Sequence, residues 1–280
     1  MTGQAVLDAR MGLADLQLAL DWAEKEGWNP GLDDAAAFLG ADPDGFFMRR
    51  IDGRPVSAIS VVNHAPDFAF IGLFICLPEF RQLGHGYGLA QAVIGHAGAR
   101  TIGLDGVAEQ QENYGRAGFV AVGATLRHEG EAIPEAGVVR AVRAQDLDSL
   151  LDLDVAANGY RRPAFVAGWM TDTGSRRTLV QEDGGRITGA VTWRRSIRGT
   201  KVGPVYAQST RDALGLIGAA AQSSGGAGPF VIDVPEANRT LRRELEALGY
   251  TVAFATARMY RGTPPQSGTA LAAIATMELG

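Results

Sequence analysis

The chain has 280 residues, of which 46% are hydrophobic, and a formal net charge of −5. This composition suits one large or two ordinary globular domains and gives no electrostatic reason to expect nucleic acid or an anionic membrane as the main partner. The single cysteine excludes an internal disulfide and a cysteine-rich metal site. No apolar run approaches the roughly 18 to 20 residues of a membrane span and no signal peptide is visible, so we expect a cytoplasmic protein.

In chain order, the first half alternates strands and helices. Strands are predicted at 5–10, 45–51, 55–63, 67–77, 101–105 and 119–127. Helices are predicted at 13–27, 33–40, 86–98 and 109–117. Because helices lie between strands, the pattern indicates an α/β or α+β sheet domain.

The second half repeats parts of the first. Residues 118–127 align with 249–258, keeping the glycine, the aromatic position, the threonine and the arginine. The turn at 52–59 aligns with 184–191 at nearly the same offset. Two matches at one offset indicate duplication of a whole domain.

The boundary between the repeats is predicted in 127–137, a stretch with charges, Pro134 and glycine. We therefore divide the chain into 1–132 and 133–280. The second-half elements are predicted as strands at 176–182, 186–194 and 200–207, and helices at 210–223 and 237–247. The apolar stretch 270–277 is expected to pack back on its domain.

A glycine-rich turn joins the predicted strand 67–77 to the predicted helix 86–98. It reads PEFRQLGHGYG over 78–88. Backbone N–H groups that converge at a helix start form an anion site, and glycines let a phosphate approach without a Cβ in the way. An ordinary strand-to-helix loop is the plain alternative. A dinucleotide-binding fingerprint fits less well, because the glycines lack its spacing.

With a second segment, this turn resembles a known family. The residues that carry the likeness are Cys76, Pro78, Arg81, Gly84 and Gly86, followed by YGRAGF at 114–119. The order and spacing are similar to the GNAT acyltransferase superfamily, whose members bind acetyl-CoA. The likeness covers residues 1 to about 130. The second half looks like the same fold without the loop, as in tandem GNAT proteins with a degenerate C-terminal domain. The resemblance implies an α+β, sandwich-like fold around mixed β-sheets.

The resemblance also implies a binding site for acetyl-CoA. The main chain around Ile75, Cys76 and Leu77 would pair with the pantetheine and polarise the thioester carbonyl. The backbone N–H groups that would hold the pyrophosphate belong to Gln82, Leu83, Gly84, His85, Gly86, Tyr87 and Gly88. The Arg81 side chain need not touch phosphate and would instead brace the loop.

Two residues near 114 would complete this site. Tyr114 matches the family tyrosine that protonates the CoA thiolate, and a phenol with a pKa near 10 is a plausible acid toward a thiolate. The alternative is a tyrosine that simply packs at a helix end. Asn113 would hydrogen-bond the pantetheine arm or cap a helix turn.

The general base is harder to find. Residues 68–76 contain no carboxylate, although many family members carry a glutamate on this strand. Asp67 and His64 are candidates, each with a plain turn residue as the alternative. By resemblance, the loop at Trp28 would line the acceptor pocket, and Asp33 and Asp34 would either join it or cap the next helix.

Other polar residues are given structural roles. Cys76 lies in an apolar strand without a basic neighbour in sequence, so it is expected to be inert, and His85 is expected to face solvent. No grouping has metal-ligand spacing, so no metal is expected. In the second half, Asp212 falls at the repeat position of Arg81, where it would repel pyrophosphate and form a capping box with Ser209.

The sequence therefore predicts an acetyl-CoA-dependent N-acetyltransferase. It would act on a primary amine of a small molecule by direct attack in a ternary complex, and it could form a homodimer. Two alternatives stay open: an acyl-CoA-binding sensor or scaffold without turnover, and a protein or peptide acetyltransferase, which would need an open groove.

Overall fold

The computed structural model describes residues 4–226 and 228–280, and across these residues all strands belong to one sheet. The strands are β1 (Val6–Arg10), β2 (Phe46–Ile51), β3 (Arg54–Asn63), β4 (Phe68–Cys76), β5 (Thr101–Gly106), β6 (Val120–Gly130), β7 (Arg140–Ala141), β8 (Arg176–Asp183), β9 (Arg186–Ser196), β10 (Gly199–Tyr206), β11 (Phe230–Pro235), β12 (Thr251–Arg261) and β13 (Leu271–Ala273). The helices are α1 (Leu13–Lys25), α2 (Asp34–Ala41), α3 (His85–Val93), α4 (Gln111–Arg116), α5 (Leu147–Asn158), α6 (Pro163–Trp169), α7 (Thr210–Ser223) and α8 (Arg239–Ala247). Short 3-10 turns lie at Pro78–Phe80, Ile94–Ala97, Ala108–Gln110 and Ala144–Asp146.

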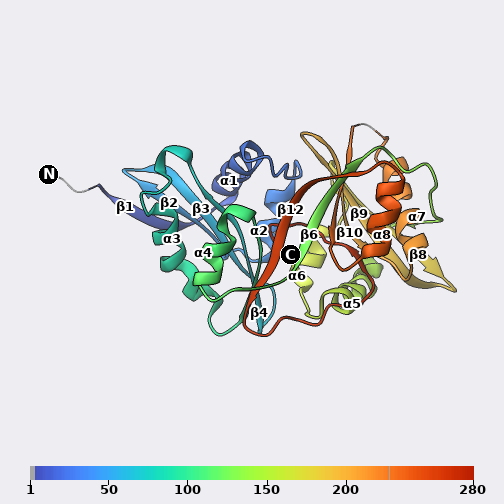
Figure 1. Cartoon of the computed structure of the whole chain (residues 1–280). Helices are drawn as coiled ribbons and strands as arrows, with labels where there is room; N and C mark the ends of the chain where they lie inside the picture. Colours follow the sequence, from blue (N-terminus) through green and yellow to red (C-terminus); the bar gives the residue numbers. More distant parts are fainter. Residues whose placement is uncertain (1–3, 227) are drawn as a thin grey trace.

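The two halves exchange their closing strands. The strand order is β1-β2-β3-β4-β5-β12-β6-β11-β10-β9-β8-β7, with β13 paired to β10. β12 of the second half therefore pairs with β5 of the first, and β6 of the first half pairs with β11 of the second. Figure 1 shows β6 and β12 running side by side through the middle of the molecule, and β12 extends into the first half. One continuous sheet results.

The sheet is mixed, as predicted. Most neighbouring strands are antiparallel, and the pairs β4–β5 and β10–β11 are parallel. Each parallel pair needs a crossover, which contains α3 in the first half and α7 in the second. The fold is thus α+β, with the same arrangement in both halves.

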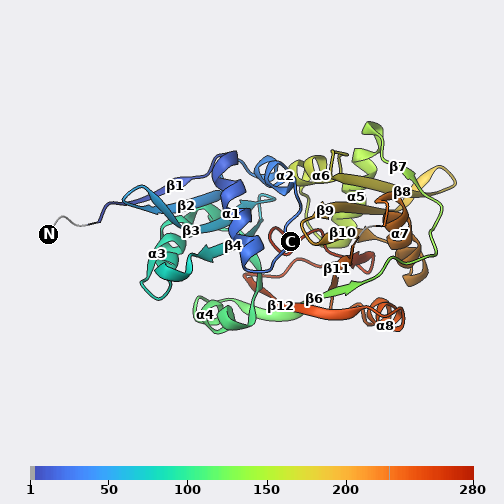
Figure 2. The ribbon, with the colours of Figure 1, turned by 90° about the horizontal axis from the view of Figure 1, so that it is seen from above.

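Helices cover both faces of the sheet. Because side chains alternate along a strand, Phe46 and Met48 of β2 face the core formed with α1, α2, α5 and α6, while Phe47 faces the core formed with α3. A further core lies under α7 and α8. The core with α1 and α2 draws residues from both halves, so they are packed as one body. In Figure 2, α2 and α6 lie side by side where the halves meet.

Most predicted elements are present, with boundaries shifted by a few residues. The predicted helix 86–98 is shorter, because α3 ends at Val93 and a 3-10 turn follows. Helix α7 begins as predicted: the Asp212 N–H donates to Ser209 Oγ at 3.1 Å, and the Ser209 hydroxyl donates to the Asp212 carboxylate. The segment 271–280 packs back on the molecule as expected, with β13 on β10. In the described part of the chain, no helix has the length and apolar character needed to cross a membrane.

Candidate functional site

The glycine turn forms a cradle of backbone N–H groups. Gln82 and Gly84 both have positive φ, +63° and +83°, which turns the chain into α3 at His85. The N–H groups of 82–87 donate to no backbone carbonyl of the described residues, and the first bond of the helix runs from the Gly88 N–H to the Gly84 carbonyl at 2.8 Å. Six successive N–H groups before and at a helix start favour an anion.

Arginines support this cradle from behind. Arg81 Nε donates to the Cys76 carbonyl at 2.9 Å, and its guanidinium pairs with Glu26. Arg49 Nη1 donates to the His85 carbonyl at 3.0 Å. A Cβ at Gly88 would overlap this guanidinium, so the glycine there makes room for arginine and not for a ligand. The contacts of the Arg81 side chain are thus with the protein itself.

Strand β4 separates from β5 halfway along its length. The two strands pair only from Phe68–Ile71 to Thr101–Leu104, and beyond this point the β5 side of β4 has no strand partner among the described residues. Leu73 has a φ of +46°, at an irregularity in the pairing with β3. On the β3 side, the Leu77 N–H donates to the Val56 carbonyl at 3.0 Å. The open edge of β4 leads from the cradle into the sheet.

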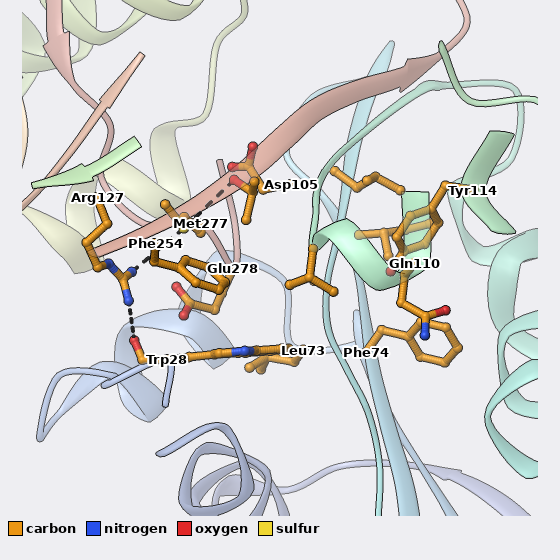
Figure 3. A pocket seen from close by; sticks show the side chains of 15 residues that line it. Trp28, Leu73, Phe74, Asp105, Gln110, Tyr114, Arg127, Phe254, Met277 and Glu278 are labelled. Carbon is orange, nitrogen blue, oxygen red and sulfur yellow. Dashed lines mark hydrogen bonds between the residues drawn. The ribbon is translucent and has the colours of Figure 1, made fainter. Parts of the chain in front are cut away.

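A pocket lies at this separation. It is lined by Trp28, Ile71, Gly72, Leu73, Phe74, Leu104, Asp105, Val107, Gln110, Tyr114, Arg127, Phe254, Thr256, Met277 and Glu278. Most of these side chains are apolar or aromatic, as in ordinary small-molecule sites. Figure 3 shows that residues of both halves surround the same space. Trp28, expected from the sequence to line the acceptor pocket, is one of these residues.

Two buried ion pairs fix the far wall of the pocket. Arg258 donates to both oxygens of Asp105, at 2.9 and 2.7 Å. Arg127 does the same to Asp233, at 2.8 and 2.9 Å, and its third nitrogen donates to the Trp28 carbonyl at 2.9 Å. Lys201, also buried, lies near Arg127 and Trp28. Burial and the neighbouring arginine lower the pKa of Lys201 to about 8.

Tyr114 reaches the pocket from α4. Its ring lies against Gly106, where a Cβ would come within 3.1 Å of the ring, and meets the edge of the Phe119 ring at 6.0 Å between centroids. Burial raises the pKa of Tyr114 to about 12, so the hydroxyl keeps its proton over the ordinary pH range. A protonated phenol at the pocket wall is a proton donor.

The pocket contains a carboxylate that the sequence reasoning missed. Glu278 lies near the end of the chain, is 4% exposed, and lines the pocket beside Gly72. The search for a base considered only β4 and its entrance. The only sequence signal was an acidic residue within a C-terminal apolar stretch.

Other predicted residues lie elsewhere. Asn113 is exposed and bonded to Gln110, just before α4, and to Arg116 at the end of α4, so it caps no helix. Asp67 is exposed before β4 and is not among the pocket residues. His64 is buried, its Nε2 lies 2.8 Å from the Leu279 carbonyl, and burial and Arg162 lower its pKa to about 3. Neither residue lines the pocket as a base would.

The remaining acids and the cysteine have structural surroundings. The Asp34 carboxylate is buried against Arg176 and Arg194, and Asp33 pairs with Arg176, so neither joins the pocket. Burial raises the pKa of the Cys76 thiol, which makes it a poor nucleophile. Among the described residues, no group of three or more His, Cys, Asp or Glu side chains could hold a metal.

Comparison with known proteins identifies the family. The sequence profile described as "Acetyltransferase (GNAT) family" matches residues 13–119, and the profile described as "Acetyltransferase (GNAT) domain" matches 150–271. Holothin acyltransferase from Pseudoalteromonas sp. (strain SANK 73390) is 32% identical over 272 residues, which cover 96% of this chain and 92% of that protein. The chain belongs to the GNAT acetyltransferase family.

Solved structures show the same tandem GNAT fold. A candidate acetyltransferase from Pyrococcus horikoshii superposes with a TM-score of 0.83 at 21% identity, covering 100% of this chain and 98% of that one. A tandem GNAT protein from the clavulanic acid biosynthesis pathway gives a TM-score of 0.63 at 14% identity, covering 92% and 99%. This protein is therefore a tandem GNAT acyltransferase.

Proposed function

We propose that this GNAT protein transfers the acetyl group of acetyl-CoA to a primary amine of a small molecule, by direct attack in a ternary complex. Acetyl-CoA would bind in the first half, between the cradle at 82–87 and Tyr114; the Gly88 N–H, which the sequence also assigned to the pyrophosphate, is instead used by the helix. The second half would be a degenerate domain that binds no acyl-CoA and closes the acceptor pocket.

One observation carries this proposal: the row of N–H groups at 82–87, which have no backbone acceptor, continues into the open edge of β4, which ends at the pocket. The N–H groups fit the pyrophosphate of CoA, since they converge at the start of α3. The open edge at Gly72–Cys76 fits an extended pantetheine, which would pair with the main chain around Ile75, Cys76 and Leu77. The space beside Gly84 is open, since a Cβ there would meet nothing within 4 Å.

The chain's own residues supply positioning and a proton. Bound acetyl-CoA provides the thioester carbonyl that an amine attacks. Main-chain groups of β4 would orient that carbonyl, because the irregularity at Leu73 turns the strand beside the pocket. Tyr114 would hold a proton for the leaving sulfur, and its raised pKa keeps that proton in place until sulfur becomes a thiolate.

The pocket supports a small acceptor with an apolar body. Its walls come from both halves, and Trp28, Phe74 and Phe254 give it aromatic surface. A protein or peptide acceptor would need an open groove instead. The relative named holothin acyltransferase supports the same conclusion, because it is named for acyl transfer to holothin.

The second half lacks the features of the cradle. Helix α7 follows β10 through Ala207, Gln208 and Ser209, without a glycine turn, and Asp212 lies in its first turn. This carboxylate binds Gln181 and the Ser209 hydroxyl, and its charge would repel a pyrophosphate. The second half instead contributes Phe254, Met277 and their neighbours to the pocket.

Calorimetric titration with acetyl-CoA, and with NAD as the control, tests the proposal. We expect one site per chain for acetyl-CoA and no heat of binding for NAD. A screen of primary amines by release of free thiol then identifies the acceptor. Failure to bind acetyl-CoA, or two equivalent sites, would contradict the assignment of the cradle and of the degenerate half.

A further inference from the structure

Glu278 stands where the first half meets the second. It follows β13 in a segment whose residues from Ala272 to Gly280 are all buried. A Cβ on Gly72 would overlap the Glu278 carbonyl oxygen, so the absence of a side chain at Gly72 lets this segment lie directly on β4. The contact occurs beside the irregularity at Leu73, where β4 turns away from β5.

The carboxylate of Glu278 is only partly satisfied. The Thr276 hydroxyl donates to its Oε2, whereas no donor in the described residues bonds to Oε1. In Figure 3 the carboxylate lies among Phe254, Trp28 and Arg127, inside the ring of pocket residues. Oε1 is not fully enclosed, and because Glu278 lines the pocket, a ligand or water there can donate to this oxygen.

The other acids near the pocket are already occupied. Asp105 and Asp233 each accept two hydrogen bonds from one arginine, which leaves little lone-pair capacity for a substrate. Glu278 has no ion pair within 4.0 Å among the described residues. Arg127 and Lys201 are the cations close enough to act on it electrostatically, and both are held by other partners. Of the two acids in the lining, Glu278 has the freer carboxylate.

We propose that Glu278 is the general base for the acceptor amine, supplied by the second half to the active site of the first. The inference rests on the proposed acetyl transfer to an amine. As the amine nitrogen bonds to the acetyl carbon and the carbon–sulfur bond breaks, one N–H proton passes to Glu278 Oε1. The Tyr114 hydroxyl proton passes to the leaving sulfur. Solvent returns a proton from Glu278 to Tyr114, so the products are the amide and free CoA thiol.

This assignment explains two features together. β4 contains no carboxylate of its own, and the second half contributes a buried carboxylate beside the same strand. The assignment also means that the second half contributes a catalytic group to the reaction although it binds no acyl-CoA itself. Catalysis would then depend on the packing of 271–280 against Gly72, and not only on the first half.

The test compares Glu278→Gln with the full-length native chain. We measure the acetyl-CoA Kd, the melting temperature, and thiol release with a panel of 2-phenylethylamine, aniline, spermidine, glucosamine and free amino acids. The variant is expected to keep Kd within about twofold and to lose kcat on the order of 10²-fold or more, the usual weight of a general base. Glu278→Asp, which keeps the acid but shortens the side chain, is expected to recover part of the rate. Glu246→Gln, at a surface glutamate of α8 with a side chain 48% exposed, is the matched control.

The outcomes separate the two proposals. If Glu278→Gln binds acetyl-CoA normally and turns over at the native rate, the base assignment is overturned and the proposed function stands. If the native chain binds acetyl-CoA but acetylates no amine of the panel, the proposed function and the base fall together. If Glu278→Gln lowers the melting temperature and the acetyl-CoA affinity along with kcat, and Glu278→Asp recovers none of them, the role of Glu278 is structural. That result would also overturn the base assignment.

Discussion

Arg127 of β6 forms a buried, two-hydrogen-bond ion pair with Asp233 of β11, at 2.8 and 2.9 Å. The pair joins a strand of the first half to the sheet of the second. The third nitrogen of the same guanidinium donates to the Trp28 carbonyl. The Arg127 side chain therefore stabilises both the pairing of the two halves and the wall of the pocket. The geometry of the pocket therefore depends on the pairing of the two halves.

Asp233→Asn should destabilise the whole protein. Burial alone would raise the pKa of Asp233, but Arg127 outweighs it and holds the pKa at about 2. Removing the charge leaves a buried arginine uncompensated, which costs about 3–5 kcal/mol. Denaturant unfolding followed by circular dichroism measures the loss. Glu112→Gln, which breaks the exposed pair with Arg116, is the control and should cost less than about 1 kcal/mol. Equal losses of unfolding free energy in the two variants would show that the buried ion pair contributes no more to stability than the exposed one.

Leu83→Glu should weaken the binding of acetyl-CoA. Leu83 is 63% exposed in the cradle, so the substitution adds a negative charge beside the N–H groups that have no backbone acceptor, without disturbing the core. We expect the Kd from calorimetry to rise on the order of tenfold, and less at high salt, because screening weakens the repulsion. Leu248→Glu is the matched control, since Leu248 is also exposed, at 47%, and lies beyond α8. An unchanged acetyl-CoA Kd in Leu83→Glu would show that the cradle is not part of the binding site.

The local features of this fold could be predicted from the sequence, and its strand exchange could not. The turn at 78–88 and the Ser209–Asp212 cap are formed by residues close in sequence, with chemistry that specifies them. The exchanged strands are the repeat segments 118–127 and 249–258, whose apolar patterns are nearly the same. Either strand satisfies either sheet position by pattern alone, so only the packing of the whole molecule decides the pairing.

The candidate site divides in the same way. Trp28, Tyr114 and the cradle were inferred from segments whose order along the first half is fixed. Trp28 and Tyr114 line the pocket, and the open edge of β4 connects the pocket to the cradle. Glu278 comes to Gly72 through tertiary packing of a segment with no motif. His64 looked like a candidate base because it is close to β4 in sequence, but its side chain packs against Leu279 and Tyr160. Proximity in sequence does not determine which face of a strand a neighbouring loop reaches.

Tyr114→Phe should lower kcat and leave the acetyl-CoA Kd unchanged. The substitution keeps the ring packed on Gly106 and Phe119 and removes only the proton donor. General-acid catalysis contributes on the order of 10²-fold or more, which steady-state thiol release can measure. Since burial raises the pKa of Tyr114 to about 12, native kcat should not fall through loss of this proton up to about pH 10.

Tyr250→Phe provides the comparison for that variant. The Tyr250 hydroxyl donates to the Glu131 carbonyl at 2.7 Å, outside the pocket, so its loss should reduce stability without changing kcat. If both phenylalanine variants reduced kcat equally, the hydroxyl of Tyr114 would have no specific part in proton transfer.

His64 should make the protein less stable as the pH falls below 6.5. Burial and Arg162 lower the pKa of His64 to about 3 in the folded state, whereas an unfolded histidine has a pKa of about 6.5. Between these values the unfolded chain binds one more proton, so lowering the pH favours unfolding by up to roughly 1.4 kcal/mol per pH unit. We expect the free energy of unfolding to fall by about 2 kcal/mol from pH 7.5 to 5 on this account. His64→Gln, which can still donate to the Leu279 carbonyl, should flatten the slope, although His128 keeps part of it because burial also lowers its pKa. Denaturant titrations at several pH values measure both slopes, and parallel curves for the native chain and the variant would show that His64 does not control acid stability.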